Sequence, residues 1–431
     1  MKIVKGFSSV RQKKPSAIAE MTVAAIAVAL LLAPCAMAAN TYKVVHRFNG
    51  QDGAAPYSAL ILDASGNFYG TTSSGGTLGG GTVFKLTPIA NGSWTESVLY
   101  NLPGGPGGYF PYAGLTQDSV GNLYGAAALG GNTSCNNIGG CGTIFKLTSN
   151  SDGSWTPSVL HTFTGGDGDG PYGNLVFDAA GQNLYGTTVA GGSGAECPGG
   201  CGVVFKLAPN SDGSWTESVL HSFTSGADGQ LPRAGLVFGA GNLYGTTVLG
   251  GGSAVCTGGC GVVFKLAPNS GGSWTESVLH SFSWVDGATP YDALVFDAAG
   301  NLYGTTGGGG TGGSGTVFKL APKPDGSWRE IVLHNFGSAQ NVEPVGGLIF
   351  DSVGNLYGTT WVGGVGDGTV FKMIRNSRGG WTFTKLHLFE GNPAMQPYDS
   401  LVSDTAGRLY GTTSACGSGA GCSGTVFEII P

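Results

Sequence analysis

The sequence predicts an all-β protein folded as a seven-bladed β-propeller, and three observations lead to this prediction. The first is composition: 81 of 431 residues are glycine, 41% are hydrophobic and only 11% are charged. The second is a set of short motifs that recurs seven times, and the third is a pair of complementary chain ends. The hydrophobic content excludes a disordered, highly charged chain. Glycines without a three-residue period exclude collagen.

Residues 1–39 are predicted to be a signal peptide. Five basic residues precede an apolar run over 21–33, and Ala36–Ala38 forms a small-x-small cleavage pattern. The alternatives are an uncleaved anchor, for which the apolar run is short, and a lipid on Cys35, which Pro34 disfavours. We therefore expect an exported protein, located in the periplasm, on the cell surface or outside the cell, with no membrane span in the mature chain.

Loss of the signal peptide leaves 15 basic and 25 acidic side chains, a net charge of −10. Nucleic acid binding depends on phosphate neutralisation by Lys and Arg, so nucleic acid is excluded as a partner. Docking on anionic lipid is disfavoured for the same reason. The partners that remain are a polysaccharide or an extracellular protein.

Residues 40–431 are predicted to form one repeat domain. The tripeptide Leu/Phe-Tyr-Gly recurs on average about every 57 residues, a period typical of repeat architectures. Its tyrosines are Tyr69, Tyr124, Tyr185, Tyr244, Tyr303, Tyr357 and Tyr410. Each copy is followed by a G-[TV]-[VI]-F-[KE]-[LMI] motif, and every copy but the last also by a motif like Trp215–Phe223.

Each repeat contains four extended runs, which in the third copy cover 174–178, 183–188, 203–207 and 215–223. The runs are rich in Val, Phe, Tyr, Leu and Thr and are bounded by Gly, Pro, Asn or Asp, which predicts strands. A D-x-x-G-N turn joins the first two, because Asp and Asn satisfy turn backbone groups and Gly supplies a positive φ. The mature chain shows no hydrophobic pattern with a period of 3.6 residues, so no helix is predicted in it.

The two chain ends complement each other. Residues 42–48 match the fourth strand of a repeat, and residues 424–427 match the third strand. The last blade therefore lacks its outer strand, and the N-terminal strand completes it and closes the ring. An open β-solenoid is the alternative, but a solenoid has no need of complementary ends.

The repeats resemble a known family. Gly300–Thr306, a Gly-rich stretch and then Gly315–Leu320 are similar to the GloVer tandem repeat of bacterial exported "choice-of-anchor" proteins. The resemblance covers residues 41–431 and implies an exported repeat protein without an assigned reaction. Family members often carry a C-terminal surface anchor, whereas this sequence ends at Pro431, within the last predicted blade. The D-x-x-G-N-L-Y run is also loosely similar to lactonase-like and NHL-type propellers.

Eight cysteines outside the signal form four close pairs, each between the second and third strands of a blade. The pairs are Cys135/Cys141, Cys197/Cys201, Cys256/Cys260 and Cys416/Cys422. An even count, local pairing and an export signal predict disulfides. The alternative is a zinc site formed by the second and third pairs.

Histidine and tryptophan each recur at one repeat position. The histidines are His46, His161, His221, His280, His334 and His387, and the tryptophans are Trp94, Trp155, Trp215, Trp274, Trp328 and Trp381. The histidines lie on outer strands too far apart to ligate one ion, so we expect them to hydrogen-bond a neighbouring blade or turn. We also expect stability to change between pH 7 and 5. The tryptophans are interpreted as blade packing rather than sugar platforms.

The candidate ligand site lies on the face formed by the loops that lead into each blade. Five of these loops end in Pro-Tyr, and two tryptophans outside the repeat pattern lie in loops. The candidate residues are Tyr57, Tyr112, Tyr172, Tyr291, Tyr398, Trp284, Trp361, Asp292 and Asp399. Tyrosine combines an apolar face with a hydroxyl, which suits sugars and peptides. The alternative is that these residues serve only turn geometry and packing.

Two function classes follow. The first is a non-catalytic binding or scaffolding propeller. The second is a carbohydrate-active or lactone-active enzyme using carboxylates such as Asp292 and Asp399 as acid and base. A uniform Tyr/Gly lining favours the first, and clustered non-repeating acids favour the second. No nucleophile-elbow, H-E-x-x-H or P-loop motif is present. No cofactor or metal is predicted, although the acidic leading loops, with Asp167 and Asp169, make Ca²⁺ a candidate.

Overall fold

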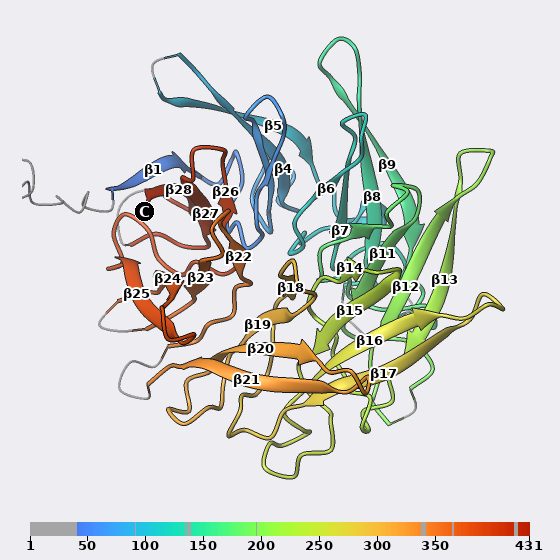
Figure 1. Ribbon diagram of the computed structural model, residues 1–431. Coiled ribbons are helices and arrows are strands. Elements are labelled where there is room, and N and C mark those ends of the chain that lie inside the picture. Colours follow the sequence, from blue (N-terminus) through green and yellow to red (C-terminus); the bar gives the residue numbers. More distant parts are fainter. Residues whose placement is uncertain are drawn as a thin grey trace, which may run out of the picture. The chain divides into compact units, whose positions relative to one another are not determined.

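The computed structural model describes residues 41–431 except 91, 134, 136–138, 195, 338–341, 364–365 and 418–420. The predicted signal peptide lies outside these residues. The described residues form seven four-stranded antiparallel sheets, arranged as blades around a common centre (Figure 1). The predicted seven-bladed β-propeller is therefore confirmed. No helix within the described ranges is long and apolar enough to cross a membrane.

The first strand of each blade lies nearest the centre, and the fourth lies at the rim (Figure 1). Blades 1 and 2 comprise β2 (Ile61–Leu62), β3 (Phe68–Thr72), β4 (Thr82–Pro88), β5 (Trp94–Asn101), then β6 (Thr116–Gln117), β7 (Leu123–Ala127), β8 (Thr143–Ser149) and β9 (Trp155–Thr162). Blades 3 and 4 comprise β10 (Val176–Phe177), β11 (Leu184–Thr188), β12 (Val203–Pro209), β13 (Trp215–Ser222), then β14 (Val237–Gly239), β15 (Asn242–Thr247), β16 (Val262–Pro268) and β17 (Trp274–Ser281).

Blades 5 and 6 comprise β18 (Val295–Phe296), β19 (Leu302–Thr306), β20 (Thr316–Pro322), β21 (Trp328–Asn335), then β22 (Ile349–Phe350), β23 (Leu356–Thr360), β24 (Thr369–Arg375) and β25 (Trp381–Leu388). Blade 7 comprises β26 (Val402–Ser403), β27 (Leu409–Thr413), β28 (Thr425–Ile430) and β1 (Thr41–Arg47). A short 3-10 helix, η1 (Gly105–Gly107), lies in the loop before blade 2.

The first strands are shorter than the sequence predicts. In blade 3 the pairing covers only Val176 and Phe177, against a predicted run over 174–178. The residues before them form the channel lining, and the Asn174 carboxamide oxygen accepts a hydrogen bond from the Gly114 backbone N–H of blade 2. Contact with the neighbouring blade therefore replaces ladder pairing at the centre.

The N-terminal strand completes blade 7, as predicted. Strand β1 pairs antiparallel with β28, with Tyr42 opposite Ile429 and Arg47 opposite Thr425. Because β28 is paired on both sides, the ring has no exposed edge at this position.

The hydrophobic core lies between adjacent blades. One buried cluster, for example, joins Ile144 and Phe163 of blade 2 to Leu184 and Phe205 of blade 3. Strand β11 is buried along its whole length, and a Cβ at Gly186 would lie 2.5 Å from the Phe205 ring. The Gly of the Leu-Tyr-Gly motif therefore leaves room for the phenylalanine of the next motif.

Threonines on the second strands link neighbouring blades around the channel. Each donates its hydroxyl to a backbone carbonyl of the next blade, at the residue that follows the leading-loop tyrosine position. The bonds are Thr71 to Ala113 (2.9 Å), Thr187 to Ala234 (2.8 Å), Thr246 to Asp292 (3.4 Å), Thr305 to Gly346 (3.0 Å), Thr359 to Asp399 (3.0 Å) and Thr412 to Ser58 (3.0 Å). They fix the backbone at the candidate site.

All four predicted disulfides are present: Cys135–Cys141, Cys197–Cys201, Cys256–Cys260 and Cys416–Cys422. Each closes the loop between the second and third strands of its blade. The zinc alternative is wrong, because the cysteines bond each other within their own loops. Such disulfides are typical of proteins in oxidising compartments.

Candidate functional site

The loop face is built by the leading loops and the loops between second and third strands. In six blades a β-bridge joins the two, as between Asp169 and Ala190 or between Ala288 and Gly308. In blade 6 the Trp361 backbone N–H donates to the Glu343 carbonyl at 2.8 Å. The leading loops are thus anchored to their own blades, so their last residues are held at the channel mouth.

All five predicted tyrosines and both predicted aspartates line one central cavity. Tyr57 packs against Tyr112 at 5.4 Å and against Tyr398 at 5.3 Å between ring centroids. Tyr112 stacks on Tyr172 at 5.0 Å. Burial raises the pKa of Tyr112, Tyr172 and Tyr398 above the usual value for a phenol. The ring therefore presents neutral hydroxyls and aromatic faces.

Arg233 occupies the tyrosine position in blade 4. Its guanidinium lies 5.1 Å from the Tyr172 ring centroid and 5.8 Å from that of Tyr291, which are favourable cation–π distances. Val345 occupies the same position in blade 6 and also lines the cavity. The mouth is therefore uneven: it is aromatic and cationic around blade 4 and apolar at blade 6.

Asp292 and Asp399 occupy the next repeat position, in blades 5 and 7. Asp292 accepts backbone hydrogen bonds from Ala293 (2.6 Å) and Gly347, and Asp399 accepts them from Ser400 (2.6 Å) and Ala59 (2.8 Å). Burial and the neighbouring Asp399 carboxyl raise the pKa of Asp292 well above its usual range. The neutral form of the Asp292 carboxyl is therefore favoured over its charged form.

Glycines of blade 6 allow these carboxyls to meet. Blade 6 has Gly346 and Gly347 where blades 5 and 7 have their aspartates and the residues after them. A Cβ at Gly347 would lie 2.4 Å from the Ser400 hydroxyl oxygen and 3.1 Å from a carboxylate oxygen of Asp292. Side chains from blades 5 and 7 thus reach each other across the backbone of blade 6.

The central cavity is narrow, but a larger pocket adjoins it. The cavity has a volume of about 50 Å³, space for one or two waters. The adjoining pocket measures about 400 Å³ and shares Tyr172, Arg233 and Tyr291 with the cavity, while Leu231 and Val248 add apolar walls. A ligand of sugar size therefore fits across the mouth of the channel and not inside it.

The two loop tryptophans differ in position. Trp361 packs edge-on against Tyr398 at 6.2 Å, and its buried indole N–H has no hydrogen-bond partner among the described residues. Trp284 does not line the cavity, and its side chain is 42% exposed. Trp361 therefore extends the tyrosine ring, whereas Trp284 lies apart from it.

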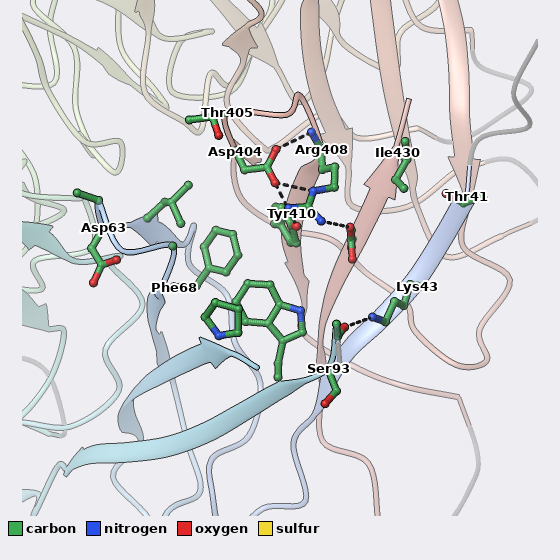
Figure 2. Close-up of a pocket in the computed structure, with 17 residues that line it drawn as sticks. Thr41, Lys43, Asp63, Phe68, Ser93, Asp404, Thr405, Arg408, Tyr410 and Ile430 are labelled. Atoms are coloured by element: carbon green, nitrogen blue, oxygen red, sulfur yellow. Dashed lines mark hydrogen bonds and ion pairs between the residues drawn. The ribbon is translucent and has the colours of Figure 1, made fainter. Parts of the chain in front are cut away.

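A further cavity lies on the opposite face, at the seam between blades 7 and 1, and the sequence did not predict it. Arg408 bridges Asp404 (2.6 Å) and Glu428 (3.5 Å). Its guanidinium lies 5.9 Å from the Tyr410 ring centroid (Figure 2). The cavity measures about 580 Å³, and Trp94 lines it. The available signal was an exchange of charge: blade 7 has Glu428 and Arg408 where most copies have Lys and Asn.

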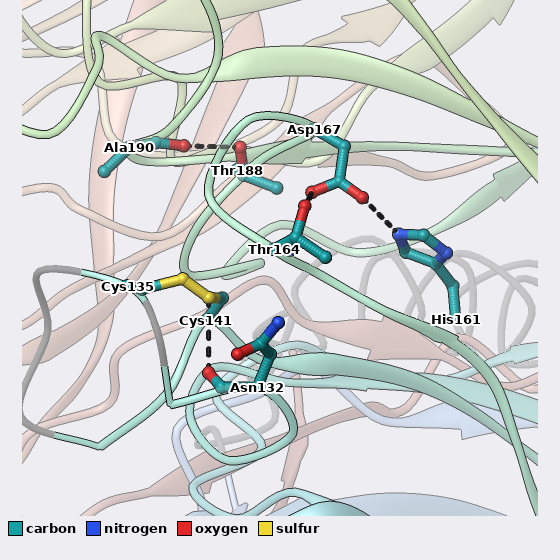
Figure 3. Close-up of a disulfide and its surroundings, with 8 residues drawn as sticks. All are labelled: Asn132, Cys135, Cys141, His161, Thr164, Asp167, Thr188 and Ala190. Carbon is teal, nitrogen blue, oxygen red and sulfur yellow. Dashed lines mark hydrogen bonds and ion pairs between the residues drawn. A yellow bond between two sulfur atoms is a disulfide. The ribbon is translucent and has the colours of Figure 1, made fainter.

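Three of the six repeated histidines hydrogen-bond leading-loop aspartates, as predicted, and a fourth, His221, lies 3.4 Å from Asp228. The His161 ring nitrogen Nε2 lies 3.0 Å from one carboxylate oxygen of Asp167 (Figure 3). The other carboxylate oxygen of Asp167 accepts a hydrogen bond from the Thr164 backbone N–H. His46 and His280 bond Asp52 and Asp286 in the same way at 3.2 and 3.0 Å.

Two histidines stack on aromatic rings instead. His334 lies 4.3 Å from Phe383, and His387 lies 4.0 Å from Tyr42, both nearly parallel. Burial lowers the pKa of His334 and of His387 below the usual value for histidine. Both imidazoles are therefore neutral in the folded protein at pH 7.

These two histidines predict a loss of stability in acid. The unfolded chain binds their protons near pH 6.5, whereas the folded chain binds them at lower pH. The contribution of these two histidines to stability is therefore full above pH 6.5 and declines as the pH falls through 6.5 toward their lowered folded-state pKa values. Thermal melts from pH 8 to pH 5 measure the decline, and a His387→Phe variant, which keeps the stacking, should show a smaller one. An equal decline in both proteins would contradict this assignment.

The family follows from comparison of the sequence. A family model described as a Gloeobacter/Verrucomicrobia repeat matches residues 34–258, 133–338 and 253–431. The chain belongs to this repeat family. The overlapping matches of the Gloeobacter/Verrucomicrobia repeat span all seven blades, so the resemblance found in the sequence is confirmed. No curated protein sequence matches the chain.

Solved structures are similar to this Gloeobacter/Verrucomicrobia repeat protein at low identity. The polysaccharide lyase Uly1 has a TM-score of 0.51 at 12% identity, over 90% of this chain and 99% of that chain. An α-L-arabinanase of Penicillium chrysogenum complexed with arabinobiose has a TM-score of 0.43 at 14% identity, over 73% of this chain and 91% of that chain. The PQQ domain of a Coprinopsis cinerea pyranose dehydrogenase has a TM-score of 0.42 at 12% identity, over 91% of this chain and 96% of that chain. At 12% identity, the likeness to Uly1 concerns the fold alone.

Proposed function

We propose that this protein is an exported, non-catalytic propeller that binds a polysaccharide across the mouth of its channel. The observation that carries the proposal is the ring formed by Tyr172, Arg233 and Tyr291 at the edge of a 400 Å³ pocket. Aromatic faces stack on the apolar faces of sugar rings, while phenol hydroxyls and a guanidinium hydrogen-bond sugar hydroxyls.

Binding fits the two aspartates better than catalysis does. Asp292 and Asp399 each accept two backbone hydrogen bonds, which couple blade 5 to blade 6 and blade 7 to blade 1. The cavity between them has no room for a sugar ring. Their role in this proposal is to hold the inner ring together.

A propeller-type carbohydrate-active or lactone-active enzyme is the second candidate. The raised pKa of the Asp292 carboxyl beside Asp399 favours it, because a carboxyl with a raised pKa is suited to general acid catalysis. Such an enzyme must admit the scissile bond to the channel, so the mouth has to open.

One experiment separates the two functions. Residues 40–431, produced under oxidising conditions, are incubated with a panel of soluble and insoluble polysaccharides, and retained protein and released sugar are followed together. We expect retention without release, and a loss of retention of at least tenfold for Arg233→Ala, because its contacts lie at the centre of the site. Release of sugar that Asp292→Ala abolishes would establish the enzyme. No retention on any polysaccharide would contradict the binding proposal and leave an extracellular protein as the partner to test.

A further inference from the structure

Four blade interfaces share one trio of side chains. In each, a histidine on the fourth strand of one blade faces an aspartate of the leading loop and a glutamate on the fourth strand of the next blade. The trios are His46, Asp52 and Glu96; His161, Asp167 and Glu217; His221, Asp228 and Glu276; and His280, Asp286 and Glu330. One ion shared among all histidines is excluded by their spacing, but a separate ion at each trio is not.

The donor atoms of two trios are close enough to bind one ion each. One imidazole nitrogen and two carboxylate oxygens lie within 4.8 Å of one another in the trios of His46 and His161. Ligands about 2.0–2.2 Å from a tetrahedral ion lie roughly 3.4 Å apart. The His161–Asp167 distance of 3.0 Å is already near that value, so a small movement of Glu217 completes the three-ligand set.

The glutamates lack the partners that burial requires. One carboxyl oxygen of Glu96, Glu217, Glu276 and Glu330 is buried without a hydrogen-bond partner among the described residues. Each of these glutamates also lies beside an aspartate carboxylate. A buried unpartnered oxygen is costly, and a second carboxylate nearby adds repulsion. A divalent cation relieves both.

The other interfaces serve as internal controls. Where the glutamate position holds Phe383 or Tyr42, the histidine stacks on that ring, and the sequence has Gln340 or Pro393 in place of the aspartate. At the seventh interface the histidine, glutamate and aspartate are all absent. A histidine–aspartate hydrogen bond alone needs no glutamate, whereas a three-ligand site needs both acids. The two acids accordingly occur together or not at all.

We propose that the trios of His46 and His161 each bind a divalent transition-metal ion that joins two adjacent blades. One imidazole and two carboxylates suit Zn²⁺ or Mn²⁺, whereas Ca²⁺ prefers six to eight oxygens. The trios of His221 and His280 contain the same residue types and are the candidates for weaker sites. These sites are separate from the channel mouth and do not depend on the function proposed for it.

The test uses residues 40–431 freed of metal by dialysis against EDTA. Zn²⁺, Mn²⁺ and Ca²⁺ are titrated separately by calorimetry, bound metal is counted after gel filtration, and thermal melts are recorded. We expect at least two Zn²⁺ or Mn²⁺ per chain and a rise of a few degrees in the melting midpoint. Glu96→Gln/Glu217→Gln should weaken binding at least tenfold at two sites, whereas exposed Glu390→Gln should not.

Melts of the metal-free variants establish that they fold, so a loss of binding is attributable to the lost ligands. Metal uptake unchanged by the double substitution would overturn the proposal, as would uptake that leaves the melting midpoint unmoved. Binding of Ca²⁺ as tight as that of Zn²⁺ or Mn²⁺ would contradict the proposed ligand set of one imidazole and two carboxylates. Failure to bind any of the three ions would show that the trios are hydrogen-bonding networks only.

Discussion

Deletion of the first strand should open the propeller. A chain of residues 48–431 should melt ~5 °C or more below residues 40–431 and should aggregate on heating. Strand β1 pairs with β28 over six residues, and its Tyr42 ring stacks on His387 and meets the Phe389 ring edge-on at 5.8 Å. Without β1, the otherwise buried β28 becomes an exposed edge that invites pairing with another chain.

Calorimetry and size-exclusion chromatography measure both effects. A peptide of residues 41–48 added in excess provides the control, because it should restore part of the lost midpoint by pairing with β28. Equal melting midpoints for the long and short chains would show that the ring does not depend on closure by β1.

Adding one methyl group at the Gly of a Leu-Tyr-Gly motif should reveal how tightly the repeat is packed. Gly245→Ala should lower the free energy of unfolding by about 1–3 kcal/mol, because its Cβ would lie 2.6 Å from the Phe264 ring and 2.9 Å from Leu236. Both neighbours are buried in the core between blades 3 and 4, so neither can move into solvent. Denaturant unfolding provides the measurement.

A double-mutant cycle separates this clash from other causes. Phe264→Leu opens space beside Gly245, so the two substitutions together should cost about 0.5–3 kcal/mol less than the sum of their separate effects. Gly271→Ala is the matched control: no atom lies within 4 Å of its added Cβ, and stability should not fall. Additive effects of Gly245→Ala and Phe264→Leu would argue against direct contact as the cause.

Repetition made most of the fold and part of the site predictable. Tyr57, Tyr112, Tyr172, Tyr291 and Tyr398 hold the same position in their repeats, and seven-fold closure brings equivalent positions to one ring. Asp292 and Asp399 hold the next position, and the absence of side chains on Gly346 and Gly347 allows the two carboxyls to meet. Side chains at equivalent repeat positions can therefore be predicted to meet at the channel mouth without any knowledge of their contacts.

Contacts between different repeat positions were harder to predict. Glu217 faces His161 only because the fourth strands of consecutive blades lie side by side, and no motif records that alignment. The joint occurrence of the glutamate and aspartate in four copies was the available signal. The short first strands were missed because neighbouring blades, rather than the ladder, satisfy residues such as Asn174 at the channel.

We propose that a polysaccharide binds the loop face at Arg233. Affinity electrophoresis in gels containing the polysaccharide retained from the panel tests it most directly, with Arg233→Ala compared against Trp94→Ala, which alters the cavity on the opposite face. We predict that Arg233→Ala abolishes the retardation while Trp94→Ala migrates like the unaltered protein. Retardation lost only with Trp94→Ala would exclude the site at Arg233 and place the ligand at the seam between blades 7 and 1.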